Sequence, residues 1–274
     1  MVSLDARSST SSETGSASPQ RSASGARTDP VSRILPGPVP PRLANRRRIK
    51  ARDAHMRHER ELHLAGFRRI AGLDEVGRGC LAGPVVAAAV VLPERHRIKG
   101  IRDSKVLPRA RREALYELIL DRAEGVGVGC VEVEVIDRIN ILQATKLAMR
   151  DALDRLAEPP DHLLIDALRL RDVDLPQRPI IDGDAISASI AAASIVAKVT
   201  RDRICREIDQ RYPGYGFARH KGYGTRRHVD ALIRDGPCAW HRRSFAPIRL
   251  LLAGTQLPLE LEWEIVDEEA LGLD

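Results

Sequence analysis

From about Phe67 onward, hydrophobic and polar positions recur with regular spacings, and these spacings predict both strands and helices. Alternating and short apolar runs predict strands at residues 69–74, 84–92, 126–135, 162–168 and 179–181. Helical spacing predicts helices at residues 109–123, 136–157 and 187–212. The last helix is rich in Ala and Ser over its first half, which favours close packing on a sheet. Strands come first and then alternate with helices, so we predict an α/β domain with a mixed central sheet flanked by helices.

The two ends of the chain differ in composition from its middle. Residues 1–60 are rich in Ser, Pro and Arg and carry 12 basic against 5 acidic residues, so we predict a disordered basic leader. Residues 254–274 carry 7 acids and no base, and they form an acidic tail. The predicted folded domain spans residues 61–253, with a C-terminal helical part over about 212–253. The leader is also compatible with a transit peptide, or with added non-specific affinity for nucleic acid.

The charge balance narrows the class of partner. The chain has 274 residues and a net charge of +6, with a sequence pI of about 9.4, which favours a polyanionic partner. Its four cysteines are widely spaced and form no C-x-x-C pair, which fits a cytoplasmic protein better than a disulfide framework or a zinc knuckle. The longest apolar run, residues 84–92, is too short to span a bilayer, so we expect no membrane association. We also expect a monomer.

Four carboxylates lie at or just after predicted strands: Asp74, Glu75, Asp166 and Asp184. An acid at the end of an apolar run is costly to desolvate unless a positive charge compensates for it. One interpretation is structural: Arg78 pairs with Asp74 or Glu75, and Arg169 pairs with Asp166. In the other interpretation the four acids converge and bind divalent metal, because Mg²⁺ and Mn²⁺ prefer carboxylate oxygens. A two-metal carboxylate site on a basic protein is suited to phosphodiester hydrolysis.

The sequence Gly77-Arg78-Gly79 follows the first two acids. Consecutive strand residues point to opposite faces, so Asp74 and Glu75 share a site only where the strand ends or bulges, and the glycines favour such a break. In the simplest interpretation the motif is a hairpin turn with Arg78 in solvent. In the functional interpretation its backbone amides and carbonyls bind a sugar–phosphate, because no Cβ obstructs a close approach.

A second candidate region combines rings and basic side chains. Six of the nine aromatic residues lie in it: Tyr212, Tyr215, Phe217, Tyr223, Trp240 and Phe245. They are interleaved with basic residues: Arg219, His220, Lys221, Arg226, Arg227, His228, Arg242 and Arg243. This combination favours nucleic-acid binding, although we expect most of the rings to fill a small helical core. Tyr223 lies between two glycines, so we expect its ring to be exposed.

Several motifs, in order along residues 68–250, resemble those of ribonuclease HII. They are LDEVGRG at 73–79, DSK at 103–105, LLIDA at 163–167, GD at 183–184, SIAAASIVAKVTRD at 189–202 and HKGYGT at 220–225. The resemblance implies a ribonuclease H-like fold with a C-terminal helical extension. It also implies hydrolysis of RNA in RNA–DNA hybrids and incision 5′ of single ribonucleotides in duplex DNA, leaving 3′-OH and 5′-phosphate ends.

The resemblance also implies roles for individual residues. The catalytic, metal-binding acids would share two Mg²⁺ or Mn²⁺ ions with the scissile phosphate, and they are Asp74, Glu75, Asp166 and Asp184. Gly77, Arg78 and Gly79 would recognise the ribose 2′-OH, the group that distinguishes RNA from DNA. Tyr223 would stack on the sugar of the following deoxynucleotide. Phosphate would be bound by Ser104 and Lys105.

The sequence departs from the family pattern at three positions. Cys80 follows the glycine motif where proline is usual, and we expect it to pack as a small residue. Val106 replaces a lysine, and Asp182 stands where a lysine often precedes the GD pair, so the site is less positive.

Three rival interpretations remain. The related ribonuclease HIII would need a folded N-terminal substrate-binding domain, for which residues 1–60 are too polar. A catalytically inactive RNA–DNA hybrid-binding protein would gain nothing from four carboxylates that face phosphates. A general phosphate-ester hydrolase would not account for Tyr223 or the glycine motif.

Overall fold

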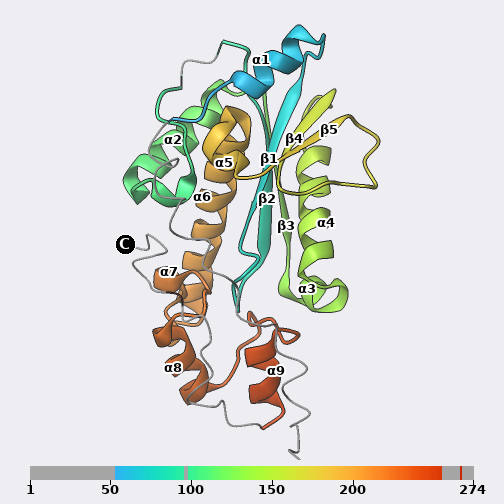
Figure 1. Cartoon of the computed structure of the whole chain (residues 1–274). Coiled ribbons are helices and arrows are strands. Elements are labelled where there is room, and N and C mark those ends of the chain that lie inside the picture. Colours follow the sequence, from blue (N-terminus) through green and yellow to red (C-terminus); the bar gives the residue numbers. More distant parts are fainter. Residues whose placement is uncertain (1–52, 96–97, 255–265, 267–274) are drawn as a thin grey trace, which may run out of the picture. The chain divides into compact units, whose positions relative to one another are not determined.

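The computed structural model describes residues 53–95, 98–254 and 266. The predicted leader up to residue 52 and most of the acidic tail lie outside these residues. The described residues form one sheet (Figure 1) with the strands β1 (Ile70–Val76), β2 (Val85–Val91), β3 (Gly125–Val131), β4 (His162–Asp166) and β5 (Gln177–Ile180). The helices are α1 (Arg57–Leu64), α2 (Arg109–Arg122), α3 (Val133–Ile139), α4 (Ile141–Asp154), α5 (Gly183–Ile186), α6 (Ala188–Arg211), α7 (Phe217–His220), α8 (Arg226–Asp235), α9 (Ala246–Leu252) and the short 3₁₀ helix η3 (Ser104–Val106).

The sheet is mixed, as predicted. Its order is β3-β2-β1-β4-β5, in which β1 is antiparallel to β2 and parallel to β4, and β4 is parallel to β5. Every residue of β2 is buried, which matches its continuous apolar sequence VVAAAVV, because helices cover both faces of the sheet. The strand that carries the first two acids, β1, is therefore the central strand, with a hydrogen-bonded strand on each side.

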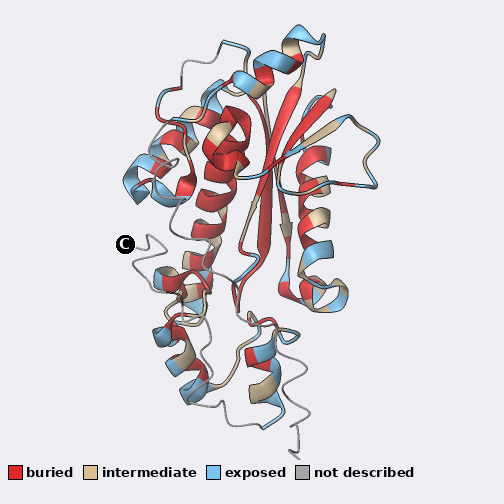
Figure 2. Ribbon diagram, in the orientation of Figure 1, coloured by how far each residue is buried: buried red, intermediate tan, exposed pale blue. Residues whose placement is uncertain are grey.

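Helices α6 and α4 cover opposite faces of the sheet (Figures 1 and 2). The first half of α6 lies very close to β1, because a Cβ added at Gly72 would overlap the backbone of Ser189. The predicted run of small residues in α6 therefore permits direct contact between helix and strand. This contact fixes α6 and the elements attached to it relative to the central strand.

Two elements differ from the predicted boundaries. The strand β3 ends at Val131 and α3 begins at Val133, within residues that the alternation predicted to be strand. The single helix predicted over residues 136–157 is two helices. Asn140 separates them with a φ of 68°, and its side chain accepts hydrogen bonds from the amides of Leu142 and Gln143 at the start of α4.

Helix α1 crosses residue 60, the predicted boundary between leader and domain. Its Glu59 is buried, and Oε1 accepts hydrogen bonds from Ser187 Oγ at 2.7 Å, Ser189 Oγ at 2.6 Å and Ser189 N at 2.9 Å. These hydrogen bonds to one buried carboxylate oxygen connect α1 to the start of α6, while Oε2 of Glu59 has no hydrogen-bond partner among the described residues. The packed part of the chain therefore begins before residue 61.

The helices α7, α8 and α9 form the C-terminal helical part, beyond one end of the sheet (Figure 1). Rings fill its small core, as predicted, with Tyr215 and Phe217 buried and Tyr212, Trp240 and Phe245 packed against them. None of the described helices is long and apolar enough to cross a membrane. The four cysteines of the chain are free.

Candidate active site

Asp74 and Glu75 lie together near the end of the central strand. As the glycines predicted, β1 ends directly before Gly77, since its ladder with β2 stops at Val76. The pairing of β1 with β4 stops earlier, at Leu73, so both acids extend past the parallel pair. The amide of Glu75 donates a hydrogen bond to Asp74 Oδ1 at 2.8 Å, which turns the Asp74 carboxylate along the strand.

Asp166 and Asp184 reach the same edge of the sheet from other elements. Asp166 is the last residue of β4, and because β4 runs parallel to β1 it lies beside Asp74, one step beyond the last paired residues. The short helix α5 carries Asp184. Its first residue, Gly183, donates its amide hydrogen to Asp166 Oδ1 at 2.8 Å, which connects α5 to the end of β4. We call Asp74, Glu75, Asp166 and Asp184 the carboxylate edge.

The four acids of the carboxylate edge raise one another's pKa. Burial raises the pKa of Asp74 well above its usual value, and the charges of Glu75, Asp166 and Asp184 raise it further. Burial is also the main cause of the raised pKa of Glu75, Asp166 and Asp184. The edge is therefore a poorly solvated site in which negative charge is insufficiently compensated.

Such a site fits a hard divalent cation, which prefers oxygen ligands. Glu75 Oε2 is buried and has no hydrogen-bond partner among the described residues. Lys105 Nζ lies 3.4 Å from Asp184 Oδ2. Burial alone would lower the pKa of Lys105, but the charges of Asp184, Asp103 and Asp74 outweigh it and raise that pKa. Lys105 therefore supplies positive charge to the edge when no cation is bound.

In this structure the acids are not at the spacing that a bound metal ion requires. Across the described part of the chain, no three His, Cys, Asp or Glu side chains have the spacing of a metal-binding group. One of the structural ion pairs considered from the sequence is present, with Arg78 Nη1 3.0 Å from Glu75 Oε1. The other, Arg169 with Asp166, does not occur among the described residues. Asp182 raises the pKa of Asp166, so this departure from the family pattern does add negative charge.

The structure separates the two residues that the resemblance assigned to phosphate. Lys105 lies at the carboxylate edge, and its side chain is 64% exposed. Ser104 is buried, its hydroxyl is 2.9 Å from Ser194 Oγ, and its carbonyl accepts a hydrogen bond from Arg112. In this arrangement Lys105 is available to an incoming anion, whereas the Ser104 hydroxyl is engaged inside the protein.

The segment 77–83, which we call the glycine loop, leaves the carboxylate edge directly. Gly77 has a φ of 94°, and a Cβ there would overlap the side chain of Arg201, so only glycine fits. Gly79 is different, because a Cβ there would meet no atom within 4 Å. Cys80 is fully buried, which confirms its predicted packing role. The loop thus has a packed side at Gly77 and Cys80 and an open side at Gly79.

Tyr223 belongs to a second loop, residues 220–225, which we call the tyrosine loop. The two loops are joined by a hydrogen bond from the amide of Leu81 to the carbonyl of Gly222, at 2.8 Å. Tyr223 is half-buried, so the prediction of an exposed ring is wrong. Tyr223 is partly buried despite its flanking glycines, because the tyrosine loop packs on the glycine loop. The neighbouring Cys80 and burial raise the pKa of Tyr223, which keeps the phenol neutral.

Two arginines are fully buried beside these loops: Arg201, to which sequence reasoning gave no role, and Arg242, which it grouped with the basic residues that favour nucleic-acid binding. Arg201 donates to the carbonyls of Pro84, Ala82 and Lys221, at 2.9, 3.0 and 2.8 Å. Arg242 donates to carbonyls of the glycine loop. The sequence carries no signal for these contacts, because each one joins residues that are far apart in the chain.

A histidine cluster of His220, His228 and His241 forms part of the core of the C-terminal helical part. His228 Nε2 lies 3.0 Å from His241 Nε2, and the ring of His220 stacks on that of His228 at 4.2 Å. Burial lowers the pKa of His228 well below its usual value and the pKa of His241 to about 4. His228 and His241 are therefore neutral packing groups at neutral pH.

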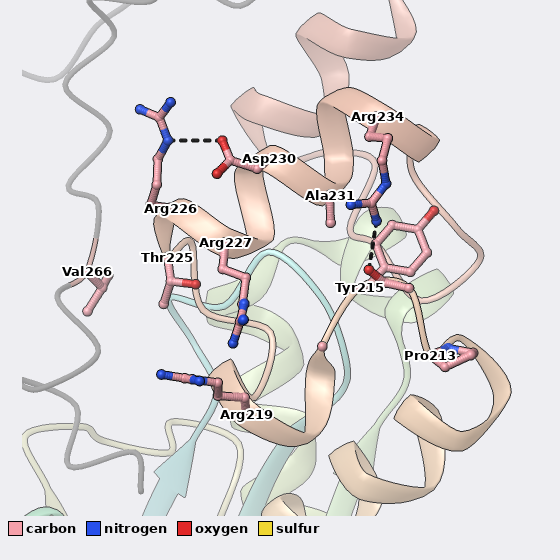
Figure 3. A pocket seen from close by; sticks show the side chains of 12 residues that line it. Pro213, Tyr215, Arg219, Thr225, Arg226, Arg227, Asp230, Ala231, Arg234 and Val266 are labelled. Atoms are coloured by element: carbon pink, nitrogen blue, oxygen red, sulfur yellow. Dashed lines mark hydrogen bonds and ion pairs between the residues drawn. The ribbon is translucent and has the colours of Figure 1, made fainter.

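A hollow of about 880 Å³ lies in the same helical part, and none of its lining residues belongs to the carboxylate edge (Figure 3). Its basic lining residues are Arg219, Arg226, Arg227 and Arg234. Arg226 pairs with Asp230 at 2.9 Å, and Arg234 pairs with Asp235 at 2.6 Å. The hollow therefore adds a basic surface to which residues on both sides of the tyrosine loop in the chain contribute.

The sheet order, the two covering helices and the acids at the adjoining ends of β1 and β4 define a ribonuclease H-like protein. The family model of ribonuclease HII matches residues 71–248. Ribonuclease HII of Geobacillus kaustophilus is 54% identical over 214 residues, which cover 78% of this chain and 82% of that protein. The chain belongs to the ribonuclease HII family, whose members are endoribonucleases.

Solved structures show the same fold. The ribonuclease H2 from Pyrococcus horikoshii is similar with a TM-score of 0.57 and 28% identity, over 68% of this chain and 98% of that chain. Bst-RNase HIII in complex with Mn²⁺ is similar with a TM-score of 0.52 and 20% identity, over 71% of this chain and 72% of that chain. The second likeness concerns the fold alone.

Proposed function

We propose that the chain is an endonuclease that hydrolyses the RNA strand of RNA–DNA hybrids and incises duplex DNA 5′ of single ribonucleotides, leaving 3′-OH and 5′-phosphate ends. The observation that carries the proposal is the continuity of three features. The carboxylate edge continues directly into the glycine loop, and the glycine loop is hydrogen-bonded to the tyrosine loop. A nucleotide next to the acids therefore meets both recognition loops at once.

The carboxylate edge would bind two Mg²⁺ or Mn²⁺ ions through Asp74, Glu75, Asp166 and Asp184. When bound, such ions lower the pKa of water and neutralise charge on the leaving oxygen. The acids would hold these ions at fixed positions, because Asp74, Glu75 and Asp166 lie at the ends of the paired strands β1 and β4. Once another cation compensates Asp184, Lys105 is no longer held by that acid. Lys105 can then bind a phosphate oxygen.

Substrate recognition would divide between the two loops and the basic hollow. Gly79 leaves open space beside the backbone, so a ribose can approach the amides of the glycine loop closely. Tyr223 would stack on the sugar of the following deoxynucleotide. Further along the duplex, the four arginines of the hollow supply contacts to the phosphate backbone, which position the substrate without reading its sequence.

A second candidate is a catalytically inactive protein that binds RNA–DNA hybrids. The observation that favours it is the absence, among the described residues, of three acids already at metal-binding spacing. The pair between Lys105 and Asp184 also occupies part of the edge. Both features are equally expected of a metal-dependent enzyme whose acids rearrange when metal and substrate bind.

One experiment separates these two functions. A labelled DNA duplex with a single ribonucleotide is incubated with the protein and either Mg²⁺ or Mn²⁺, beside an all-DNA duplex. The proposal predicts one nick, 5′ to the ribonucleotide, that is absent from the all-DNA duplex and abolished by a chelator. The variant Asp184→Asn should bind the duplex without nicking it. Binding by the wild-type protein without a nick in either metal would support the inactive binder.

A further inference from the structure

Arg242 is a fully buried guanidinium whose hydrogen bonds all go to backbone carbonyls, and it also lies over the ring of Phe245, 5.1 Å from its centroid. It donates to the carbonyl of Gly77 at 2.6 Å, to that of Arg78 at 3.0 Å, and to that of Gly83 at 3.0 and 2.8 Å. No carboxylate forms an ion pair with it among the described residues. Burial of an unpaired guanidinium is costly unless its donors find acceptors, so these carbonyls are what stabilises Arg242 in the core.

The carbonyls bound by Arg242 determine where the next amides point. In a planar trans peptide, the carbonyl of one residue and the N–H of the following residue point in opposite directions. Because the carbonyl of Gly77 faces Arg242, the N–H of Arg78 faces away from it. The carbonyl of Arg78 also faces Arg242, so the N–H of Gly79 likewise faces away from Arg242.

Both outward amides are free to bind a ligand. Neither Arg78 N nor Gly79 N donates a hydrogen bond to any described residue. A Cβ at Gly79 would meet nothing within 4 Å, so the space in front of this part of the loop is open. Two adjacent, unpartnered N–H groups form a concave donor site for an oxygen ligand.

We propose that Arg242 is a positioning residue for ribose selectivity, because its hydrogen bonds to the carbonyls of Gly77 and Arg78 turn the amides of Arg78 and Gly79 toward the substrate 2′-oxygen. This inference rests on the proposed function and adds a residue, 164 positions after Arg78, to its recognition step. Arg242 acts through the loop and does not itself touch the substrate.

Arg201 provides a comparison with a second buried arginine. It is equally buried and binds the carbonyls of Pro84, Ala82 and Lys221, none of which belongs to residues 77–79, although its side chain also packs against Gly77. Arg242→Lys and Arg201→Lys should therefore both lower the melting temperature. Arg242→Lys should lower the ratio between binding of a single-ribonucleotide duplex and binding of an all-DNA duplex by more than Arg201→Lys does, because only Arg242 binds the carbonyls that precede the two free amides.

The binding ratio is measured in chelator, so that no cleavage occurs, and KM and kcat are measured separately with Mn²⁺. For Arg242→Lys we expect the ratio to fall about tenfold, the size of effect that loss of one well-aligned hydrogen bond produces. The rise in KM should exceed the fall in kcat. A purely structural role would instead reduce the active fraction, which lowers kcat and leaves both the ratio and KM unchanged.

A second measurement uses the wild-type protein and decides the matter if Arg242→Lys does not fold. Hydrogen exchange of the amides of Arg78 and Gly79 is followed by NMR in chelator, with each duplex in turn. We expect fast exchange in the free protein and protection by the ribonucleotide duplex, with at least about tenfold less protection by the all-DNA duplex.

The outcomes distinguish this inference from the proposed function. If the wild-type protein does not nick the ribonucleotide duplex in either metal, the proposed function fails. If the wild-type protein nicks the duplex but Arg242→Lys keeps the full binding ratio, the inference alone is overturned. Equal protection of the two amides by both duplexes would overturn it as well.

Discussion

The carboxylate edge and the histidine cluster both contain buried titratable groups, but burial acts on them with opposite sign. At the edge, burial raises the pKa of Asp74 and Glu75, and repulsion by the other acids raises that of Asp74 further, so their charged forms are unfavourable. In the cluster, burial lowers the pKa of His228 and His241, so these two rings are neutral at neutral pH and cost little.

This difference distinguishes the carboxylate edge, which a bound cation would stabilise, from the histidine cluster, which only packs. Repulsion at the carboxylate edge is relieved by any added positive charge, whether from a metal ion, Lys105 or a proton. The histidine cluster is stable as it stands and is disrupted by a proton. As pH falls, the acids with raised pKa therefore stabilise the fold, whereas the histidines with lowered pKa destabilise it.

The largest effect is expected when one charge is removed from the carboxylate edge. Asp74→Asn should reduce cleavage of the single-ribonucleotide duplex by about a thousandfold or more, because it removes a carboxylate that we propose binds metal. The same change should raise the melting temperature, because Asp74 is repelled by the other three acids. Single-turnover rates measure the loss of cleavage, and thermal unfolding measures the change in melting temperature. A variant that is both less stable and fully active would contradict the comparison.

Two neighbouring glycines should give contrasting effects. Gly77→Ala should destabilise the fold by about 3 kcal/mol, because it combines positive φ with overlap on Arg201. Gly79→Ala should change stability by less than about 0.5 kcal/mol, since the added methyl meets nothing, but it should raise KM by obstructing the ribose. Urea unfolding and steady-state kinetics of both variants test this. Unchanged KM in Gly79→Ala would mean that no substrate approaches there.

Acidification should weaken the C-terminal helical part. The pKa of His241 is about 4 in the fold, below its ordinary value of about 6.5, so stability is lost as pH falls below that ordinary value. At pH 5 the loss through His241 should be about 2 kcal/mol. His241→Asn should be less stable at neutral pH but should lose less on acidification. Urea unfolding at both pH values measures the difference, and an identical pH dependence in the two proteins would refute it.

The smallest effect concerns metal without substrate. Added Mn²⁺ should stabilise the wild-type fold by about 1 kcal/mol at about five times its dissociation constant. Asp184→Asn should gain less, because one ligand is lost, and the gain should be greater at neutral pH than at acidic pH. Thermal unfolding with and without chelator provides the measurement. Stabilisation of equal size in wild type and variant would place the ion elsewhere.

The sequence marks the acids of the carboxylate edge locally. Each follows an apolar run, and in an α/β fold the ends of neighbouring parallel strands meet at one edge. Asp74 and Asp166 follow this rule directly. Gly77 marked the place where β1 ends. The sequence could not show that the pairing of β1 with β4 stops at Leu73, because that stop is set by a strand nearly a hundred residues later.

Other features had no local signal. Glu59 lies in a polar segment that resembles the leader in composition, and only its contacts with Ser187 and Ser189 show that it belongs to the core. Asn140 divides a helix that is amphipathic on both sides of it, so periodicity alone could not find the break. Arg242 looks like one more basic residue in a basic region. Its burial follows from the long-range packing of the glycine loop.

The distance in sequence between the glycine loop and Arg242 has a consequence for synthesis of the chain. Translation proceeds from the N-terminus, so all four acids emerge well before Arg242 does. A nascent chain that already carries the carboxylate edge still has a glycine loop whose carbonyls have no guanidinium to bind. The recognition loop is thus completed among the last steps of folding, after the acids and the sheet that carries them.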